Sequence, residues 1–165
     1  MQQIESRDTR GEFFDLCRKH KLKITPQRTS VYEALMEHKK DHPTADIMFH
    51  KVRERIPSIS YDTVNRILLK FAEIGLIDVV ERPGGPRRYD VDRDLHHHFH
   101  CIQCGRIIDF PSVDCDNIKI PEGMENNYRI ISKRVVLTGI CSICLKRNKR
   151  QHAVKINHHL KENTK

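Results

Sequence analysis

The chain has 165 residues, of which 38% are apolar and 32% charged, a composition typical of a folded protein rather than a disordered one. No apolar run approaches the roughly 20 residues that a membrane-spanning helix needs, and the first residues lack the apolar stretch of a secretion signal. We therefore expect a cytoplasmic protein that makes no membrane contact.

The formal net charge of +8 is concentrated near the C-terminus. Residues 1–94 are close to balance, with 18 basic and 16 acidic side chains, whereas residues 146–165 carry seven basic side chains and one acidic. Such a terminal segment adds loose attraction to polyanions, and we predict a mobile basic tail over residues 148–165. Net charge alone therefore does not establish DNA binding.

Residues 7–75 show the spacing of four helices. The first is predicted over about 7–21; Thr25 and Pro26 suit the start of the second, and the third is predicted from residue 43 to before Pro57. Ser60 is expected to cap a fourth helix that Gly75 ends. Its apolar side chains fall at i, i+3, i+4 and i+7: Val64, Ile67, Leu68 and Phe71.

A hairpin is predicted next, with strands at 76–82 and 87–91 and a Pro- and Gly-rich turn between them. Four helices followed by a hairpin indicate a winged helix-turn-helix DNA-binding domain over residues 1–91, with a hinge at about 90–95. The alternative is a helical domain with an incidental hairpin.

If this is a winged-helix domain, the fourth helix contacts base edges. The basic hairpin tip, which includes Arg82, then lies along phosphates. The negative charge of Asp62 would repel DNA phosphates, although the helix dipole favours an acidic residue in a first turn. The candidate DNA contacts are Arg28, Ser60, Tyr61, Thr63, Asn65, Arg66, Arg87 and Arg88.

Four of the six cysteines form two pairs, Cys101 with Cys104 and Cys141 with Cys144. Two such turns can place four sulfurs around one ion, and Zn²⁺ prefers this closed, soft ligand set. Disulfides and a redox pair are the alternatives; the expected cytoplasmic location and the two matched pairs argue against them. We predict a zinc-stabilised domain over residues 95–147.

A histidine cluster precedes the first cysteine pair. On a strand, His96, His98 and His100 share one face and His97 points the other way. Asp90, Asp109 and the isolated His42 are candidates to complete a metal site. The alternative is a surface histidine cluster without a ligand role.

The order of these motifs resembles that of the ferric uptake regulator (Fur) family over roughly residues 10–147. The motifs are Thr25-Pro26-Gln27-Arg28, His42-Pro43-Thr44-Ala45-Asp46, Asp62-Thr63-Val64-Asn65-Arg66, His96 to Gly105, and Cys141-Ser142-Ile143-Cys144. The resemblance implies an α+β protein with an N-terminal winged helix and a C-terminal α+β dimerisation domain around a zinc site of four cysteines. It implies a homodimeric, metal-dependent repressor of double-stranded DNA with a palindromic operator, and no enzyme.

When the family's metal-binding positions are matched to this sequence, the resemblance implies structural Zn²⁺ at Cys101, Cys104, Cys141 and Cys144. It implies regulatory Fe²⁺ or Mn²⁺ at His42, Asp90, His96, His98 and Asp109. Three imidazoles and two carboxylates suit either ion and leave a coordination position open to a small oxidant. An ion bound by ligands from both predicted domains would favour one angle between these domains.

Asp109 lies five residues after the second cysteine, where iron-sensing members usually have Glu and peroxide-sensing members have Asp. The chain thus resembles the peroxide-responsive (PerR) subgroup, in which a ligating imidazole, here His42 or His96, is oxidised. The alternatives are an iron- or manganese-responsive repressor and, more remotely, a non-haem iron enzyme.

Four features depart from the family pattern. Asn65 replaces a base-contacting Tyr, His100 replaces an apolar residue, and Leu95 replaces a His of a further metal site found in some members. Residues 112–125 predict only a weak helix.

Overall fold

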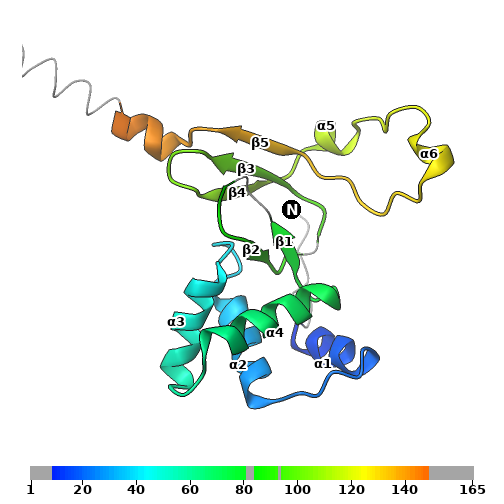
Figure 1. The fold of residues 1–165 in the computed structure, drawn as a ribbon. Coiled ribbons are helices and arrows are strands. Elements are labelled where there is room, and N and C mark those ends of the chain that lie inside the picture. Colours follow the sequence, from blue (N-terminus) through cyan, green and yellow to red (C-terminus); the bar gives the residue numbers. More distant parts are fainter. Residues whose placement is uncertain (1–8, 81–83, 93, 149–165) are drawn as a thin grey trace, which may run out of the picture. The chain divides into compact units, whose positions relative to one another are not determined.

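The computed structural model describes residues 9–80, 84–92 and 94–148 (Figure 1). The chain divides into two compact units, residues 1–94 and 95–165, and each is described by itself. Arg82 and the predicted basic tail after residue 148 lie outside the described residues. Among the helices of the described part, none combines the length and apolarity that crossing a membrane requires.

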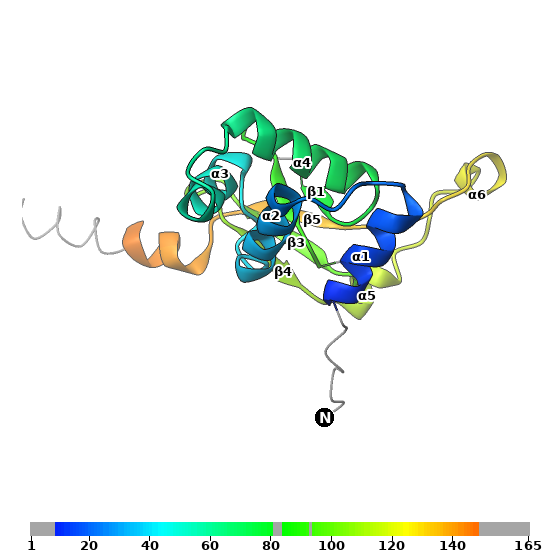
Figure 2. The same cartoon turned by 90° about the horizontal axis from the view of Figure 1, so that it is seen from below.

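The first unit contains the four expected helices, gathered into one bundle (Figure 2). Three of them begin at a side-chain cap: the hydroxyls of Thr25, Thr44 and Ser60 accept the backbone N–H three residues further on, at 3.4, 3.3 and 3.2 Å. The caps explain why these three helices begin where they do. The bounds are α1 (Thr9–Lys19), α2 (Pro26–Glu37), α3 (Ala45–Arg55) and α4 (Tyr61–Glu73).

The core of this unit lies among the four helices. Phe13 of α1 stacks on Tyr32 of α2, with ring centroids 4.4 Å apart, and meets the ring of Phe71 of α4 edge-on. The predicted apolar stripe of α4 is buried throughout. Cys17 is also buried here, and burial raises the pKa of its thiol despite the nearby positive charge of Arg28. Buried apolar packing therefore orients α4 and leaves its opposite face exposed.

The hairpin that follows is antiparallel and pairs Val79 with Tyr89. Its strands, β1 (Asp78–Val80) and β2 (Arg88–Asp90), begin later than predicted, and residues 81 and 82 of the predicted first strand lie outside the described residues. Helices α3 and α4 pack against each other ahead of this hairpin, as in a winged helix-turn-helix domain.

The second unit is built on a three-stranded sheet in the order β4-β3-β5. The strand β3 (His97–Cys101) pairs antiparallel with β4 (Ile107–Phe110) and parallel with β5 (Val136–Gly139). A parallel pair needs a long crossover. After β4, this one contains only the short helices α5 (Val113–Asp116) and α6 (Met124–Asn127). The weak helix expected at 112–125 is thus two single turns.

Candidate metal centres and DNA-facing groove

The four paired cysteines meet at one end of the β3–β5 pair. Cys101 ends β3 opposite Gly139 of β5, so the parallel register brings the second cysteine pair beside the first. The four sulfurs lie within 4.8 Å of one another, with Cys101 Sγ 3.9 Å from Cys144 Sγ and Cys104 Sγ 3.8 Å from Cys141 Sγ. A tetrahedron with Zn–S bonds of about 2.3 Å has S···S edges of about 3.8 Å. The thiols therefore fit Zn²⁺, and all are free of disulfides.

Electrostatics at this centre also suit a cation. The backbone N–H of Cys141 donates to Cys101 Sγ at 3.3 Å and, with the N–H of Cys104, lowers the pKa of Cys101 to about 6. Burial, by contrast, raises the pKa of Cys144 to about 12. Four thiolates so close together repel one another, so a bound cation is what allows all four to ionise.

Two contacts around this centre are not predicted by any sequence motif. The side-chain amides of Gln103 and Asn148 exchange two hydrogen bonds of 2.9 and 3.0 Å, which join the first cysteine turn to the helical residues after the second. The guanidinium of Arg147 lies 3.9 Å from Cys144 Sγ. No spacing rule connects residues 45 positions apart, so only the fold could reveal the amide pair.

The second unit also brings together three of the predicted regulatory ligands. His96 and His98 are buried, and their Nε2 atoms lie 2.9 Å apart. Asp109 of β4 is directly opposite His98 in the sheet register, with Oδ1 3.5 Å from His98 Nε2 and 3.9 Å from His96 Nε2. Two imidazole nitrogens and a carboxylate oxygen converging on one point suit Fe²⁺ or Mn²⁺.

The first unit brings together the other two predicted ligands. His42 Nε2 lies 3.7 Å from Asp90 Oδ2, and both residues are buried. The loop of His42 is fastened to β2, because the Tyr89 N–H donates to the Pro43 carbonyl and the Arg88 guanidinium donates to the His42 carbonyl at 2.9 Å. His42 adopts a φ of 45°, a left-handed conformation that costs a non-glycine residue about 1–3 kcal/mol. The surrounding contacts thus hold His42 beside Asp90 in a strained backbone conformation.

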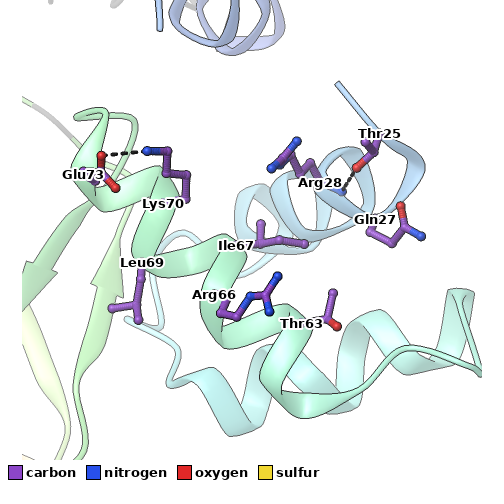
Figure 3. A pocket seen from close by; sticks show the side chains of 9 residues that line it. All are labelled: Thr25, Gln27, Arg28, Thr63, Arg66, Ile67, Leu69, Lys70 and Glu73. Carbon is purple, nitrogen blue, oxygen red and sulfur yellow. Dashed lines mark hydrogen bonds and ion pairs between the residues drawn. The ribbon is translucent and has the colours of Figure 1, made fainter. Parts of the chain in front are cut away.

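Three of the predicted DNA contacts of the helices, Arg28, Thr63 and Arg66, line one groove. It has a volume of about 510 Å³ and lies between the first turn of α2 and the outward side of α4 (Figure 3). Its cationic side chains are Arg28, Arg66 and Lys70, and Thr63 lies at its edge. Tyr61 is exposed at the start of α4, Asn65 is partly exposed, and Ser60 serves as the α4 cap.

Of the predicted contacts in the hairpin, Arg87 is exposed and Arg88 is partly buried. Because the Arg88 guanidinium donates to the His42 carbonyl, the structure gives it a role in holding the His42 loop. The expected DNA contacts of both residues stay predictions.

Comparison of the sequence with known proteins finds a matching family and several relatives. The model of the ferric uptake regulator family matches residues 19–138. The ferric uptake regulation protein of Neisseria gonorrhoeae is 30% identical over 132 residues, which cover 78% of this chain and 90% of that protein. The peroxide-responsive repressor PerR of Staphylococcus epidermidis is 28% identical over 127 residues, 77% of this chain and 84% of that protein.

Among solved structures, the ferric uptake regulator Fur of Helicobacter pylori superposes with a TM-score of 0.71 at 24% identity, covering 88% of this chain and 97% of that one. This likeness concerns the fold. The match of the family model to most of the sequence and the relative that is 30% identical lead to one conclusion: the chain belongs to the ferric uptake regulator family.

Proposed function

We propose that this protein is a homodimeric repressor of the cytoplasm that binds a palindromic DNA operator and is inactivated by peroxide. Members of the ferric uptake regulator family are metal-responsive transcription regulators and not enzymes, which sets aside the non-haem iron enzyme. The finer assignment to peroxide is carried by Asp109, the carboxylate opposite His98 in the sheet.

The regulatory ion in this proposal is Fe²⁺ or Mn²⁺, held by five side chains. The first unit contributes His42 and Asp90, and the second contributes His96, His98 and Asp109. Support comes from the two preassembled groups, each of which contains imidazole nitrogen beside carboxylate oxygen. Structural Zn²⁺ is assigned to the cysteine centre, whose S···S distances fit it.

Bound Fe²⁺ would supply the electron that begins cleavage of the O–O bond of peroxide, and Mn²⁺ would supply it poorly. In the net reaction, one oxygen atom of H₂O₂ would be inserted at a C–H bond of a ligating imidazole and the other would leave as water. The chain's part is to hold the imidazoles of His42 and His96 at the reacting centre. Addition of an oxygen atom to either ring weakens a ligand and releases one unit from the other. Fewer molecules then adopt the DNA-binding arrangement of the two units, because the ion stabilises that arrangement only while ligands from both units bind it.

Dimerisation through the second unit is supported by the edges of its sheet. In the order β4-β3-β5, β5 lies at an edge, and Val136 and Leu137 are about half exposed. An edge strand with apolar side chains is a template for pairing with another copy. A two-fold dimer presents two α4 helices, which is the symmetry that a palindrome matches.

The test compares two metal forms of the zinc-containing protein, prepared without oxygen and loaded with Fe²⁺ or Mn²⁺. Brief exposure to peroxide should abolish operator binding by the Fe²⁺ form and add one oxygen atom to the peptides of His42 or His96, measured by mass spectrometry. The Mn²⁺ form should retain its DNA affinity. Equal survival of both forms would favour a repressor for which iron or manganese occupancy is the signal, consistent with the ferric uptake regulation proteins among its relatives.

Asp109→Glu provides a matched variant, because it keeps the carboxylate and lengthens the side chain by one methylene. We expect it to retain metal-dependent operator binding while the Fe²⁺ form loses peroxide sensitivity by about tenfold, which corresponds to roughly 1.4 kcal/mol in the activation barrier. Unchanged sensitivity would remove Asp109 as the basis of the peroxide assignment.

A further inference from the structure

The cations of the DNA-facing groove are already engaged within the protein. The Arg28 guanidinium donates to the Lys23 carbonyl at 2.5 Å. Lys70 Nζ donates to Glu73 Oε1 at 2.7 Å (Figure 3). Arg66 Nη1 lies 3.7 Å from Asp62 Oδ2, one helical turn earlier. Any DNA phosphate that enters the groove must therefore compete with an oxygen atom of the protein for these cations.

Asp62 differs in its position from the Lys23 carbonyl and the Glu73 carboxylate. It lies in the first turn of α4, the end of the helix that a helix-turn-helix domain presents to base edges. Its side chain is 75% exposed and that of Arg66 is 77% exposed, so water screens their attraction and the pair adds little to stability. Neither charge is buried, and both are available to an approaching duplex.

A carboxylate in this position acts unequally on two kinds of complex. A phosphate beside Arg66 meets repulsion from Asp62 on every sequence, because the backbone charge is the same everywhere. An arginine that donates to a guanine edge is directed away from the phosphates, and its contact depends on the base. Asp62 therefore weakens phosphate contacts by Arg66 more than base contacts by the same side chain.

We propose that Asp62 is a specificity-determining residue, whose carboxylate competes with DNA phosphates for Arg66 and so suppresses binding to non-operator sequence. This inference rests on the proposed DNA-binding function. It assigns the acidic residue of α4 a part in recognition, in addition to its favourable interaction with the helix dipole.

The experiment uses the full-length protein loaded with Zn²⁺ and Mn²⁺ and two duplexes of equal length. One is selected by the wild-type protein from a random pool, and the other is a shuffled version of it. Asp62→Asn should bind the shuffled duplex about threefold or more tightly at low salt, with a log–log salt slope steeper by about 0.9, because Arg66 gains a phosphate contact. Its affinity for the selected duplex should change by less than about twofold, because there Arg66 contacts a base and the number of contacted phosphates stays the same.

Two controls isolate the contact. Asp15→Asn removes the same charge from an equally exposed ion pair, Asp15 with Arg18 on α1, outside the groove. It should shift binding to both duplexes equally and only slightly. In an Arg66→Ala background, the effect of Asp62→Asn on the shuffled duplex should disappear.

Three results would overturn the inference. Equal gains on both duplexes would mean that Asp62 acts through general charge. Weakened binding of Asp62→Asn to the selected duplex alone would mean that Asp62 accepts from a cytosine amine. Unchanged binding to the shuffled duplex would mean that Asp62 does not compete for Arg66. If the wild-type protein selected no sequence and bound neither duplex, the proposed function itself would fail, and this inference with it.

Discussion

His97 shows how completely the face of a strand decides the role of a side chain. It lies between two proposed metal ligands, yet its ring is fully buried and has other partners. Its Nδ1 accepts from the Val135 backbone N–H at 3.2 Å, and its Nε2 lies 3.1 Å from Asp116 Oδ1. His97 thus joins β3 to the crossover on both sides of its ring.

Replacing this ring should destabilise the fold and leave the metal sites intact. His97→Leu leaves the Val135 N–H without its imidazole acceptor, so we expect the free energy of unfolding to fall by about 1–3 kcal/mol in urea titrations. His50→Leu, at an exposed position on α3, should change it by less than about 0.5 kcal/mol. Loss of Mn²⁺ binding by His97→Leu at unchanged stability would make His97 a ligand instead.

At the scale of elements, the second unit depends on its cysteine centre. Its buried apolar cluster contains only Cys101, Cys141 and Cys144 among the described residues, with Phe99 packed against them. The part of the chain between β4 and β5 adds only two short helices. A sheet with so small a core needs a further constraint, and a metal that binds only the folded arrangement provides it.

Removal of one sulfur should therefore unfold this unit. We expect Cys101→Ser to contain no tightly bound Zn²⁺ and to lose the cooperative melting of residues 95–148, measured by metal analysis and circular dichroism. Cys115→Ser, which alters a cysteine outside the centre, should keep both. A folded Cys101→Ser protein with full zinc content would contradict the assignment.

The zinc affinity should also depend on pH. Because the pKa of Cys144 is raised to about 12, its thiol must release a proton when zinc binds near neutrality, so affinity falls as the pH is lowered. Below about pH 6 Cys101 must release a proton as well, and the loss becomes steeper. Competition with a chelator across this range measures the slope, and a flat profile would contradict the proposed thiolate ligands.

At the scale of the whole molecule, the proposed regulation requires that metal and DNA bind one and the same arrangement of the two units. Linkage then makes the effect reciprocal: if Mn²⁺ raises operator affinity by some factor, the operator raises Mn²⁺ affinity by the same factor. We expect a factor between about 5 and 150, the usual range of such coupling.

Titrations of Mn²⁺ with and without the selected duplex, and of the duplex with and without Mn²⁺, measure the two factors. His42→Ala should reduce both toward one, because it removes the ligand proposed from the loop beside β2. An operator that leaves Mn²⁺ affinity unchanged would show that metal does not act through the DNA-binding arrangement.

The sequence alone determined the features that depend on local spacing. The caps at Thr25 and Ser60, the buried stripe of α4 and the two cysteine pairs follow from interactions within a few residues, and the structure confirms each. The face shared by His96 and His98 follows from strand periodicity in the same way.

Only the tertiary structure decided which distant groups meet. The bond from Arg88 to the His42 carbonyl, the amide pair of Gln103 and Asn148, and the partners of His97 join residues far apart in the chain. Such contacts depend on strand register and on the path of loops, which are set by packing of the whole unit and not by neighbours in sequence. For this reason the residue types of the metal centres could be predicted from the sequence, whereas the contacts that hold His42 and His97 in place could not.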